Sequence, residues 1–342
     1  MAAENTKPSD LDIIPKYLLA DDEGLSQECL DLIATLPSEP DWFATRLYQC
    51  QGFWHTKRLT QGILNFQSHF EARDSDIFLV TFPKCGTTWL KALTSTLLNR
   101  KIHYPNPNPD LTRIISPHPL FTVNPQVLVP LLEFIQPAVS SFPSPRLLAT
   151  HLPYVSLPES LKQSRCKIIY MCRNPKDAFV SLWHFGNKLR PDHNTRDQSN
   201  KIDDAFEKFC RGVSIFGPLW DHVLGYYKES VERPEKIMFL KYEQLKDEPV
   251  KILKKLAEFI GCGFSKEEED GDVISDILKL RSFETLSNLE VNKKGKLPSG
   301  VENKVFFRRG EVGDSKNFLT ADMIQRLNAI TQEKLGKHGL KF

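Results

Sequence analysis

The chain lacks three features that mark large classes of protein: a strong net charge, closely paired cysteines and a long apolar run. Its 342 residues carry 45 Lys and Arg side chains against 43 Asp and Glu, which gives a formal charge of +2. Nucleic-acid-binding proteins usually present a basic surface, so we expect no nucleic-acid partner. An anionic ligand of this chain must instead be met by Lys and Arg side chains gathered at one place.

The seven cysteines are an odd number, and no Cys-x-x-Cys pair occurs. Zinc sites usually need such paired ligands, so we expect no metal. Cys166 and Cys172 bracket an apolar run, which indicates buried thiols and is typical of a reducing compartment. No run reaches the roughly 18 apolar residues of a membrane span, and the polar, acidic start resembles neither a signal nor a transit peptide. We therefore expect a cytoplasmic protein without a membrane partner.

Four short runs are apolar without alternation, at residues 77–82, 146–151, 166–172 and 236–242. Runs that are apolar on both faces suit parallel strands covered by helices, and helical patterns lie between them. The sequence therefore predicts an α/β fold, with a central, mainly parallel sheet flanked by helices. We expect a mobile N-terminal arm over residues 1–40, containing one helix within 25–37, and a single domain over residues 41–342.

The stretch LVTFPKCGTTWLKAL, residues 79–93, predicts a strand, a tight loop and a helix, as in a P-loop. Gly86 permits a close backbone approach, and the hydroxyls of Thr87 and Thr88 stand where the helix presents unpaired N–H groups. Lys84 adds a full charge. From these residues alone, a phosphate-binding loop and a simple helix cap both remain open.

Two further segments have the chemistry of anion sites. In YMCRNPKDAFVSLWHF, Arg173 follows a predicted strand and Ser181 lies about two helical turns later, so the two side chains suit one phosphate. In FFRRGEVGDSKNFLT, two arginines precede Gly310, where a bent backbone can direct N–H groups at an anion. Either segment alone could equally be an ordinary ion pair or surface loop.

Taken together, the three segments resemble the cytosolic sulfotransferase family, and most closely its plant branch. FPKCGTTW resembles the family's 5′-phosphosulfate loop, a P-loop-like strand–loop–helix, and the other two segments resemble its 3′-phosphate motifs. The pieces ATHLPY, LKYEQL and RSFETLSNLEVNK match as well, so the resemblance runs from about residue 40 to the end. It implies transfer of a sulfuryl group from 3′-phosphoadenosine 5′-phosphosulfate to a hydroxyl of a small acceptor, releasing adenosine 3′,5′-bisphosphate, without a metal.

The resemblance also implies roles for individual residues. His151 matches the catalytic base, and Lys84 matches a catalytic group that also binds the donor. An imidazole suits proton removal from a hydroxyl near neutral pH, and a lysine can neutralise charge on the leaving oxygen. The residues that match the donor site are Lys84, Cys85, Gly86, Thr87, Thr88, Trp89, Arg173, Ser181, Tyr242, Ser282, Phe283, Arg308, Arg309 and Gly310.

The sequence departs from the family pattern at a few positions. Ser315 stands where the family usually has tryptophan, and we expect weaker ordering of residues 306–320 as a result. Lys316 and Thr320 match the family's dimer motif, but Ala321 and Gln325 do not. We therefore expect a monomer, which a mass of two chains in size-exclusion chromatography would contradict.

The acceptor is not specified by these motifs. Aromatic side chains suit flat rings, so a flavonoid or another phenol of plant secondary metabolism is the favoured acceptor. The candidates for the pocket wall are Phe53, Trp54, Tyr154 and His184, although plain core packing explains them equally well. The alternatives are a brassinosteroid, a hydroxyjasmonate or a desulfoglucosinolate.

Two other functions remain to be weighed. A nucleotide kinase shares the strand–loop–helix start, but no G-x-x-x-x-G-K-[ST] motif is present, and magnesium-dependent turnover would distinguish it. A donor-binding protein without activity is disfavoured because Lys84 and His151 are both retained.

Overall fold

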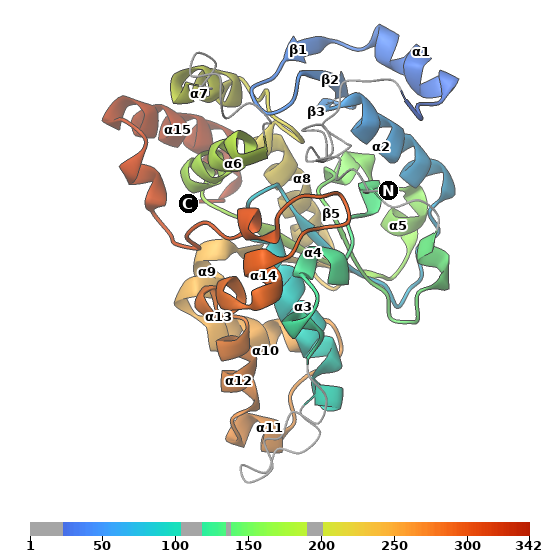
Figure 1. Cartoon of the computed structure of the whole chain (residues 1–342), viewed down its shortest axis with the longest axis vertical. Helices are drawn as coiled ribbons and strands as arrows, with labels where there is room; N and C mark the ends of the chain where they lie inside the picture. Colours follow the sequence, from blue (N-terminus) through green and yellow to red (C-terminus); the bar gives the residue numbers. More distant parts are fainter. Residues whose placement is uncertain (1–22, 104–117, 135–137, 190–200) are drawn as a thin grey trace, which may run out of the picture.

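The computed structural model describes residues 23–103, 118–134, 138–189 and 201–342. Its centre is a four-stranded parallel sheet in the order β5-β4-β6-β7 (Figure 1). The strands are β4 (Ile77–Thr81), β5 (Leu147–Thr150), β6 (Lys167–Cys172) and β7 (Ile237–Lys241). The register places Ile77 beside both Leu147 and Lys167. This confirms the predicted α/β fold with a parallel sheet flanked by helices.

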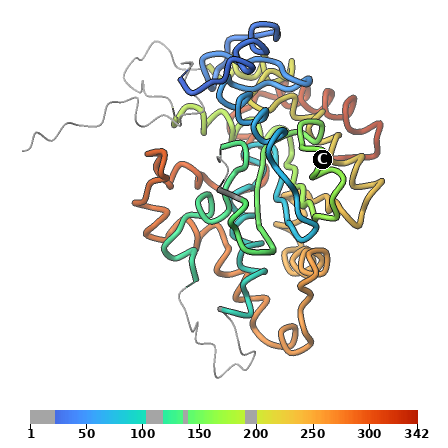
Figure 2. Tube along the Cα trace, turned by 90° about the vertical axis from the view of Figure 1, so that its right-hand side faces the viewer, coloured from blue at the N-terminus to red at the C-terminus, as the bar shows by residue number. Residues whose placement is uncertain are grey.

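Helices cover both faces of this sheet and surround it (Figures 1 and 2). The α-helices are α1 (Gln27–Thr35), α2 (Lys57–His69), α3 (Thr87–His103), α4 (Pro125–Leu128), α5 (Glu159–Gln163), α6 (Pro175–Leu189), α7 (Ile202–Cys210), α8 (Leu219–Glu232), α9 (Tyr242–Asp247), α10 (Pro249–Phe259), α11 (Lys266–Asp270), α12 (Val273–Leu280), α13 (Phe283–Asn288), α14 (Glu290–Lys294) and α15 (Ala321–Lys334). The 3-10 helices are η4 (Pro119–Phe121), η5 (Leu132–Phe134), η6 (Ala138–Ser141), η7 (Tyr154–Ser156), η8 (Asn303–Phe306), η9 (Asp314–Asn317) and η10 (Gly336–His338).

The sheet is buried on both faces, which explains the apolar runs without alternation. Along β4, Phe78 and Val80 belong to one apolar cluster, which also contains residues of α2, α6 and α8. Ile77 and Leu79 belong to a second cluster with residues of α3, α10 and α12. Because successive side chains of a strand point to opposite faces, each strand must be apolar throughout.

A second, antiparallel sheet of three short strands was not predicted. It contains β1 (Ser38–Pro40), β2 (Arg46–Cys50) and β3 (Phe53–His55) in that order. Residues 1–22 of the expected N-terminal arm lie outside the described residues. The described remainder of that arm contains α1, which confirms the predicted helix, and β1, which pairs with β2. In the described part of the chain, every helix is too short or too polar to span a lipid bilayer.

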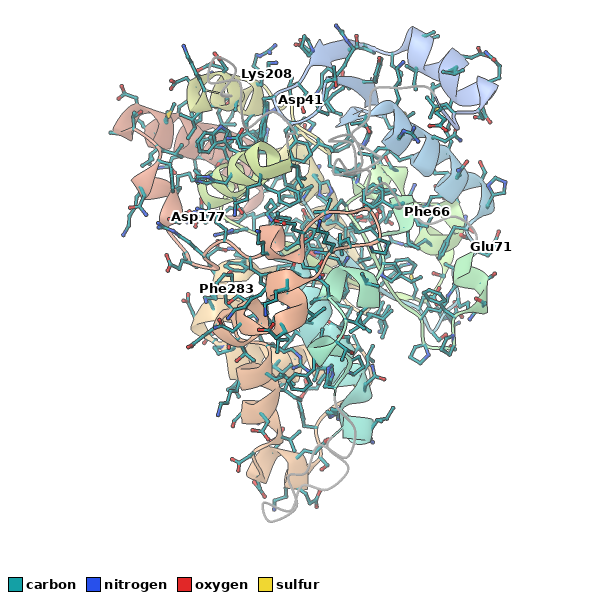
Figure 3. The ribbon with its side chains drawn as sticks, viewed as in Figure 1. Asp41, Phe66, Glu71, Asp177, Lys208 and Phe283 are labelled. Carbon is teal, nitrogen blue, oxygen red and sulfur yellow. The ribbon has the colours of Figure 1, made fainter. Side chains whose placement is uncertain are left out.

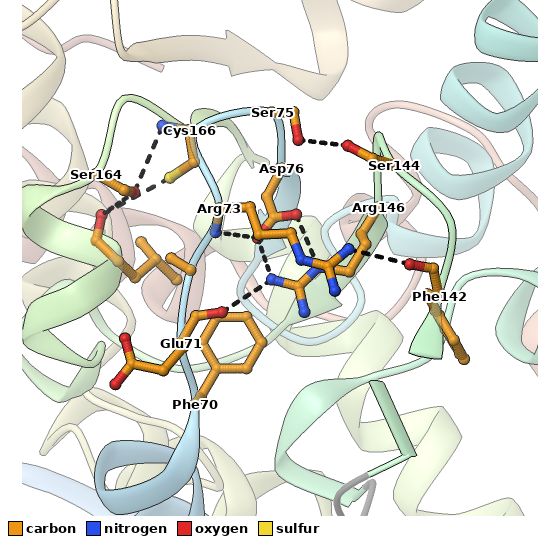
Figure 4. A network of polar contacts seen from close by, with 12 residues as sticks. Phe70, Glu71, Arg73, Ser75, Asp76, Phe142, Ser144, Arg146, Ser164 and Cys166 are labelled. Atoms are coloured by element: carbon orange, nitrogen blue, oxygen red, sulfur yellow. Dashed lines mark hydrogen bonds and ion pairs between the residues drawn. The ribbon is translucent and has the colours of Figure 1, made fainter. Parts of the chain in front are cut away.

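The amino-terminal ends of β4 and β5 are joined by a buried ion pair between Asp76 and Arg146, here called the Asp76–Arg146 clamp (Figure 4). Arg146 donates from Nε to one carboxylate oxygen of Asp76 at 2.8 Å and from Nη2 to the other at 2.5 Å. The same carboxylate accepts the backbone N–H of Arg73 at 2.8 Å. The clamp therefore fixes the strands at the end of the sheet opposite to the site described next.

Candidate active site

The carboxyl ends of the parallel strands open into one cavity of about 350 Å³. His151 follows β5, Arg173 follows β6, and Tyr242 follows β7, and each of them lines this cavity. The loop after β4 contributes Lys84 and Gly86. Parallel strands present their carboxyl ends at the same edge of a sheet, which is where α/β proteins bind ligands. The topology therefore gathers residues that lie up to 158 positions apart between Lys84 and Tyr242.

The loop between β4 and α3 holds its backbone in an unusual conformation. Lys84 has a φ of 67° and Gly86 a φ of 99°. A Cβ at Gly86 would lie 2.6 Å from Met171 Cε and 2.8 Å from Tyr242 Cδ2, so only glycine fits there. The Cys85 side chain is fully buried outside the cavity lining, and burial raises the pKa of its thiol to about 12. Any contribution of Cys85 to donor binding is thus limited to its backbone.

Lys84 brings a cation into this cavity at a free-energy cost. Burial, followed by the charges of Arg173, Lys188 and Arg308, lowers the pKa of Lys84 to about 7. Its Nζ lies 4.1 Å from the ring centroid of Phe185, which provides a weak cation–π contact. An anion bound beside these cations would relieve their mutual repulsion and restore the charged form of Lys84.

His151 is held in a single tautomer. Its Nδ1 lies 2.7 Å from the carbonyl oxygen of Thr81, which can only accept, so Nδ1 carries the proton. Nε2 is then the ring's proton-accepting nitrogen. Burial, together with the smaller effect of the charges of Lys91, His222 and Lys84, lowers the pKa of His151 to about 3, although the hydrogen bond to Thr81 acts in the opposite direction. The ring is therefore neutral at pH 7, which is the form that a general base requires.

The backbone of His151 is fixed from both sides by buried polar side chains. Its N–H donates to Glu133 Oε1 at 2.8 Å, and its carbonyl accepts a hydrogen bond from His222 Nε2 at 2.9 Å. His222 Nδ1 in turn accepts from the hydroxyl of Tyr170 at 2.9 Å. Sequence reasoning missed Glu133 and His222, because neither is near His151 in the chain.

The second group of cations lies where α6 meets residues 306–320, here called the C-terminal segment. Arg173 donates to the carbonyl of Glu311 at 2.6 Å, and its guanidinium lies 4.8 Å from the ring centroid of Tyr242. Arg308 and Arg309 both pair with Asp314, at 2.5 and 2.6 Å. The C-terminal segment thus contributes Arg308 and Arg309 to the lining of the cavity.

The same segment is fastened to α6 by Asp177, which is labelled in Figure 3. The carboxylate of Asp177 accepts the backbone N–H of Gly313 at 2.7 Å and that of Ser315 at 2.9 Å. Ser315 is buried, and the weaker ordering expected from it stays a prediction.

Gly310 is a second position where only glycine fits. It has a φ of 67°, and a Cβ there would lie 2.4 Å from Cδ2 of Phe283, whose position is labelled in Figure 3. Its carbonyl accepts the hydroxyl of Tyr242 at 2.9 Å. Trp89 meets the Tyr242 ring edge to face, with centroids 5.4 Å apart. The rings of Trp89, Tyr242 and Phe283 therefore lie together beside the backbone of Gly310.

Apart from Cys85, every residue assigned to the donor site or to catalysis lines this one cavity. They are Lys84, Gly86, Thr87, Thr88, Trp89, His151, Arg173, Ser181, Tyr242, Ser282, Phe283, Arg308, Arg309 and Gly310. They come from segments that are far apart in sequence, so their convergence is a property of the fold.

The four residues suggested for the acceptor wall do not line this cavity. Phe53 packs edge-on against His222, and the backbone N–H of Trp54 bonds to the carbonyl of Gly217. Tyr154 accepts a hydrogen bond from Arg233, and the ring of His184 packs against Phe318 with centroids 4.5 Å apart. The side chains of Phe53, Tyr154 and His184 thus contact other elements of the surrounding structure, and Trp54 belongs to the buried apolar core.

The lining of the cavity contains further aromatic residues that were not singled out from the sequence. They are Phe43, Phe134, Phe185, Phe216, Phe306 and Phe307. Two signals could have found some of them: Phe185 lies four residues after Ser181, hence on the same helix face, and Phe306 and Phe307 directly precede Arg308. Within the described residues, no cluster of His, Cys, Asp and Glu is suited to hold a metal ion.

Comparison with known proteins gives consistent matches. Residues 74–339 match the family model of the sulfotransferase domain. Cytosolic sulfotransferase 12 of Arabidopsis thaliana is 50% identical over 334 residues, covering 96% of this chain and 98% of that protein. Cytosolic sulfotransferase 5 of the same plant is 48% identical over 327 residues, covering 94% of this chain and 98% of that protein.

Solved structures give the same result. A putative steroid sulphotransferase of Arabidopsis thaliana superimposes with a TM-score of 0.72 at 42% identity, covering 96% of this chain and 99% of that one. Mouse sulfotransferase SULT7A1, solved in complex with PAP, gives a TM-score of 0.64 at 26% identity, covering 84% and 94% of the two chains.

Proposed function

Because the chain belongs to the sulfotransferase family and is a sulfotransferase, we propose that it uses 3′-phosphoadenosine 5′-phosphosulfate as donor and a phenolic hydroxyl as acceptor. The observation that carries this proposal is the convergence of Lys84, Arg173, Arg308 and Arg309 with a neutral histidine in one cavity. The related mouse enzyme was solved with PAP, the adenosine 3′,5′-bisphosphate left after transfer. That complex supports the same nucleotide for this chain.

The lining residues fit this donor chemically. Lys84, Thr87 and Thr88 belong to the loop around Gly86 and offer an ammonium group and two hydroxyls to a phosphate, while the missing Cβ of Gly86 lets the loop pack against Met171 and Tyr242. Arg173, Ser181, Arg308 and Arg309 suit the 3′-phosphate, because guanidinium groups bind phosphate through paired donors. Trp89, Tyr242 and Phe283 provide ring faces for the adenine, and Ser282 and Gly310 lie beside them.

The proposed reaction divides between two residues. His151 Nε2 takes the proton of the acceptor hydroxyl while the acceptor oxygen forms its bond to sulfur. Lys84 neutralises the charge that grows on the 5′-phosphate oxygen as the bond from this oxygen to sulfur breaks. The hydrogen bond from Nδ1 to Thr81 keeps the imidazole aimed during this exchange. The proton ends on His151, and adenosine 3′,5′-bisphosphate leaves.

A flavonoid or similar phenol is the acceptor that the wall favours, because Phe43, Phe185 and Phe306 provide flat apolar surfaces near the catalytic pair. A steroid such as a brassinosteroid is the second candidate, since one related structure is described as a putative steroid sulphotransferase.

We also propose that the chain acts as a monomer, given Ala321 and Gln325 in the dimer motif. A cytoplasmic location is proposed because the plant relatives are named cytosolic.

The test is to incubate the protein with the donor and a panel of plant phenols, steroids and hydroxyjasmonates, and to detect sulfated products by mass spectrometry. We expect phenols to be the best acceptors, and turnover without added magnesium. His151→Ala should lower kcat by about 10²–10⁴-fold, the range of general-base catalysis, and His69→Ala, an exposed control, should not. Sulfation of steroids alone would overturn the acceptor assignment, and full turnover by His151→Ala would remove the base.

A further inference from the structure

A buried lysine that the proposed mechanism does not use lies directly behind the donor loop. Lys91, one helical turn after Thr88 on α3, is fully buried, yet it does not line the cavity. Its Nζ donates to Oε1 of Gln126 at 2.6 Å. Gln126 belongs to the short helix α4 and does line the cavity. Lys91 therefore touches no ligand in the cavity, and it acts there through its contact with Gln126 and through its charge.

The contact with Lys91 determines which way the Gln126 amide faces. Because Lys91 Nζ donates in this contact, the amide oxygen of Gln126 points to Lys91 and its NH₂ group points away. Gln126 Nε2 then donates to Oγ1 of Thr88 at 2.8 Å. In this bond the Thr88 oxygen accepts, which leaves the hydroxyl proton of Thr88 to be donated elsewhere. The three residues form a directed chain that ends on a cavity-lining hydroxyl.

The position of Gln126 is itself fixed by buried groups. Asn124 caps α4, and its Oδ1 accepts the backbone N–H of Gln126 at 2.8 Å. The Asn124 amide donates to Oδ1 of Asn292 at 2.8 Å, and both asparagines are buried. These contacts fix the backbone of Gln126. The orientation of its side-chain amide is therefore set by Lys91 and Thr88.

Keeping a cation at Lys91 is costly. Burial lowers the pKa of Lys91 to about 7, partly opposed by the charge of Glu133. An apolar side chain often serves the packing of a buried site as well or better, so packing alone does not account for a lysine here. The need for a hydrogen-bond donor facing the Gln126 amide oxygen does account for the lysine.

We propose that Lys91 is a positioning residue for the donor, which acts through Gln126 to hold the Thr88 hydroxyl as a hydrogen-bond donor to the 5′-phosphate. This inference rests on the proposed donor. Removing Lys91 would free the Gln126 amide to turn over and offer its oxygen to Thr88. The Thr88 proton would then be drawn toward Gln126 and lost to the phosphate.

The test uses two nucleotides that differ only in the group concerned. Calorimetry measures the Kd of adenosine 3′,5′-bisphosphate and of adenosine 3′-monophosphate, which lacks the 5′-phosphate. We expect Lys91→Met to weaken the bisphosphate about tenfold, the effect of losing one hydrogen bond to a charged group, and to leave the monophosphate unchanged. Gln126→Met, which keeps the lysine, should do the same, and the double variant should be no worse than either single variant.

The control is Thr94→Val, a buried polar-to-apolar change on the same helix that should alter neither Kd. In turnover, the variants of Lys91 and Gln126 should raise the KM for the donor and leave the KM for the acceptor unchanged. Equal weakening of both nucleotides by Lys91→Met would overturn the proposal, as would a normal bisphosphate Kd in Gln126→Met. If the wild-type protein does not distinguish the two nucleotides, the donor assignment fails as well.

Discussion

At the scale of single residues, the site depends on burying charges that would be more stable in water. Lys84 loses hydration and lies among other cations, so its proton is held weakly until an anion arrives. His151 is kept neutral by the same burial. Repulsion among these cations and their lost hydration destabilise the charged form of Lys84, and an anionic ligand would offset this effect.

This cost predicts the pH dependence of nucleotide binding. Only protonated Lys84 attracts phosphate, and its pKa is lowered to about 7, so affinity for adenosine 3′,5′-bisphosphate should fall as the pH rises from 7 to 9. The limiting slope for one proton is about tenfold per pH unit. Phosphate ionises near pH 6, so the ligand adds little above pH 7. Calorimetry at several pH values measures the slope.

The matched variant is Lys84→Arg, because arginine stays charged throughout this range. Its slope should be smaller than that of the wild type, though not zero, since the pKa of Lys91 is also lowered to about 7. Lys251→Arg, on the exposed surface of α10, is the control and should not change the slope. An unchanged slope in Lys84→Arg would show that another group carries the pH dependence.

At the scale of elements, the C-terminal segment reaches the cavity because α6 holds it. Two backbone N–H groups, of Gly313 and Ser315, share the carboxylate of Asp177. Asp314, between them, pairs with the two arginines proposed for the 3′-phosphate. The contacts of one aspartate on α6 are therefore transmitted to the donor site.

Asp177→Asn tests this dependence. The amide can accept from only one of the two N–H groups, so the other loses its partner at a cost of about 1–3 kcal/mol. We expect faster hydrogen exchange within residues 306–320 and about tenfold weaker binding of adenosine 3′,5′-bisphosphate, as when one charge-assisted hydrogen bond is lost. Asp247→Asn, an exposed change at the end of α9, is the control. Normal exchange in residues 306–320 would contradict the assignment.

At the scale of the whole molecule, the parts that could be predicted are those that repeat a local rule. Strands such as Ile77–Thr81 are buried on both faces, and this gives continuous apolar runs that are visible in the sequence. His151 and Arg173 directly follow such strands, so their place at the sheet edge follows from topology. β1 and β3 contain three residues each, which is too short for a period to be recognised.

The aromatic lining of the cavity could not be predicted for a different reason. Phe43, Phe134, Phe216 and Phe306 come from separate segments and meet only after folding. Trp54 and Tyr154 are also aromatic, but they do not line the cavity. An aromatic residue that is close to a motif in the sequence thus does not predict the cavity lining, because tertiary packing decides where its side chain points.

The stability of the whole sheet should depend on the Asp76–Arg146 clamp. Arg146→Met leaves the carboxylate of Asp76 buried without its ion-pair partner, and breaking such a pair costs about 3–5 kcal/mol. We expect that loss in the free energy of unfolding, measured by urea titration. Because the clamp lies at the end of the sheet away from the cavity, the Kd for adenosine 3′,5′-bisphosphate should stay normal below the unfolding transition. Lys162→Met, which breaks the more exposed pair with Glu159, is the control and should cost at most about 1 kcal/mol. Equal small losses in both variants would show that the clamp contributes no more than a surface pair.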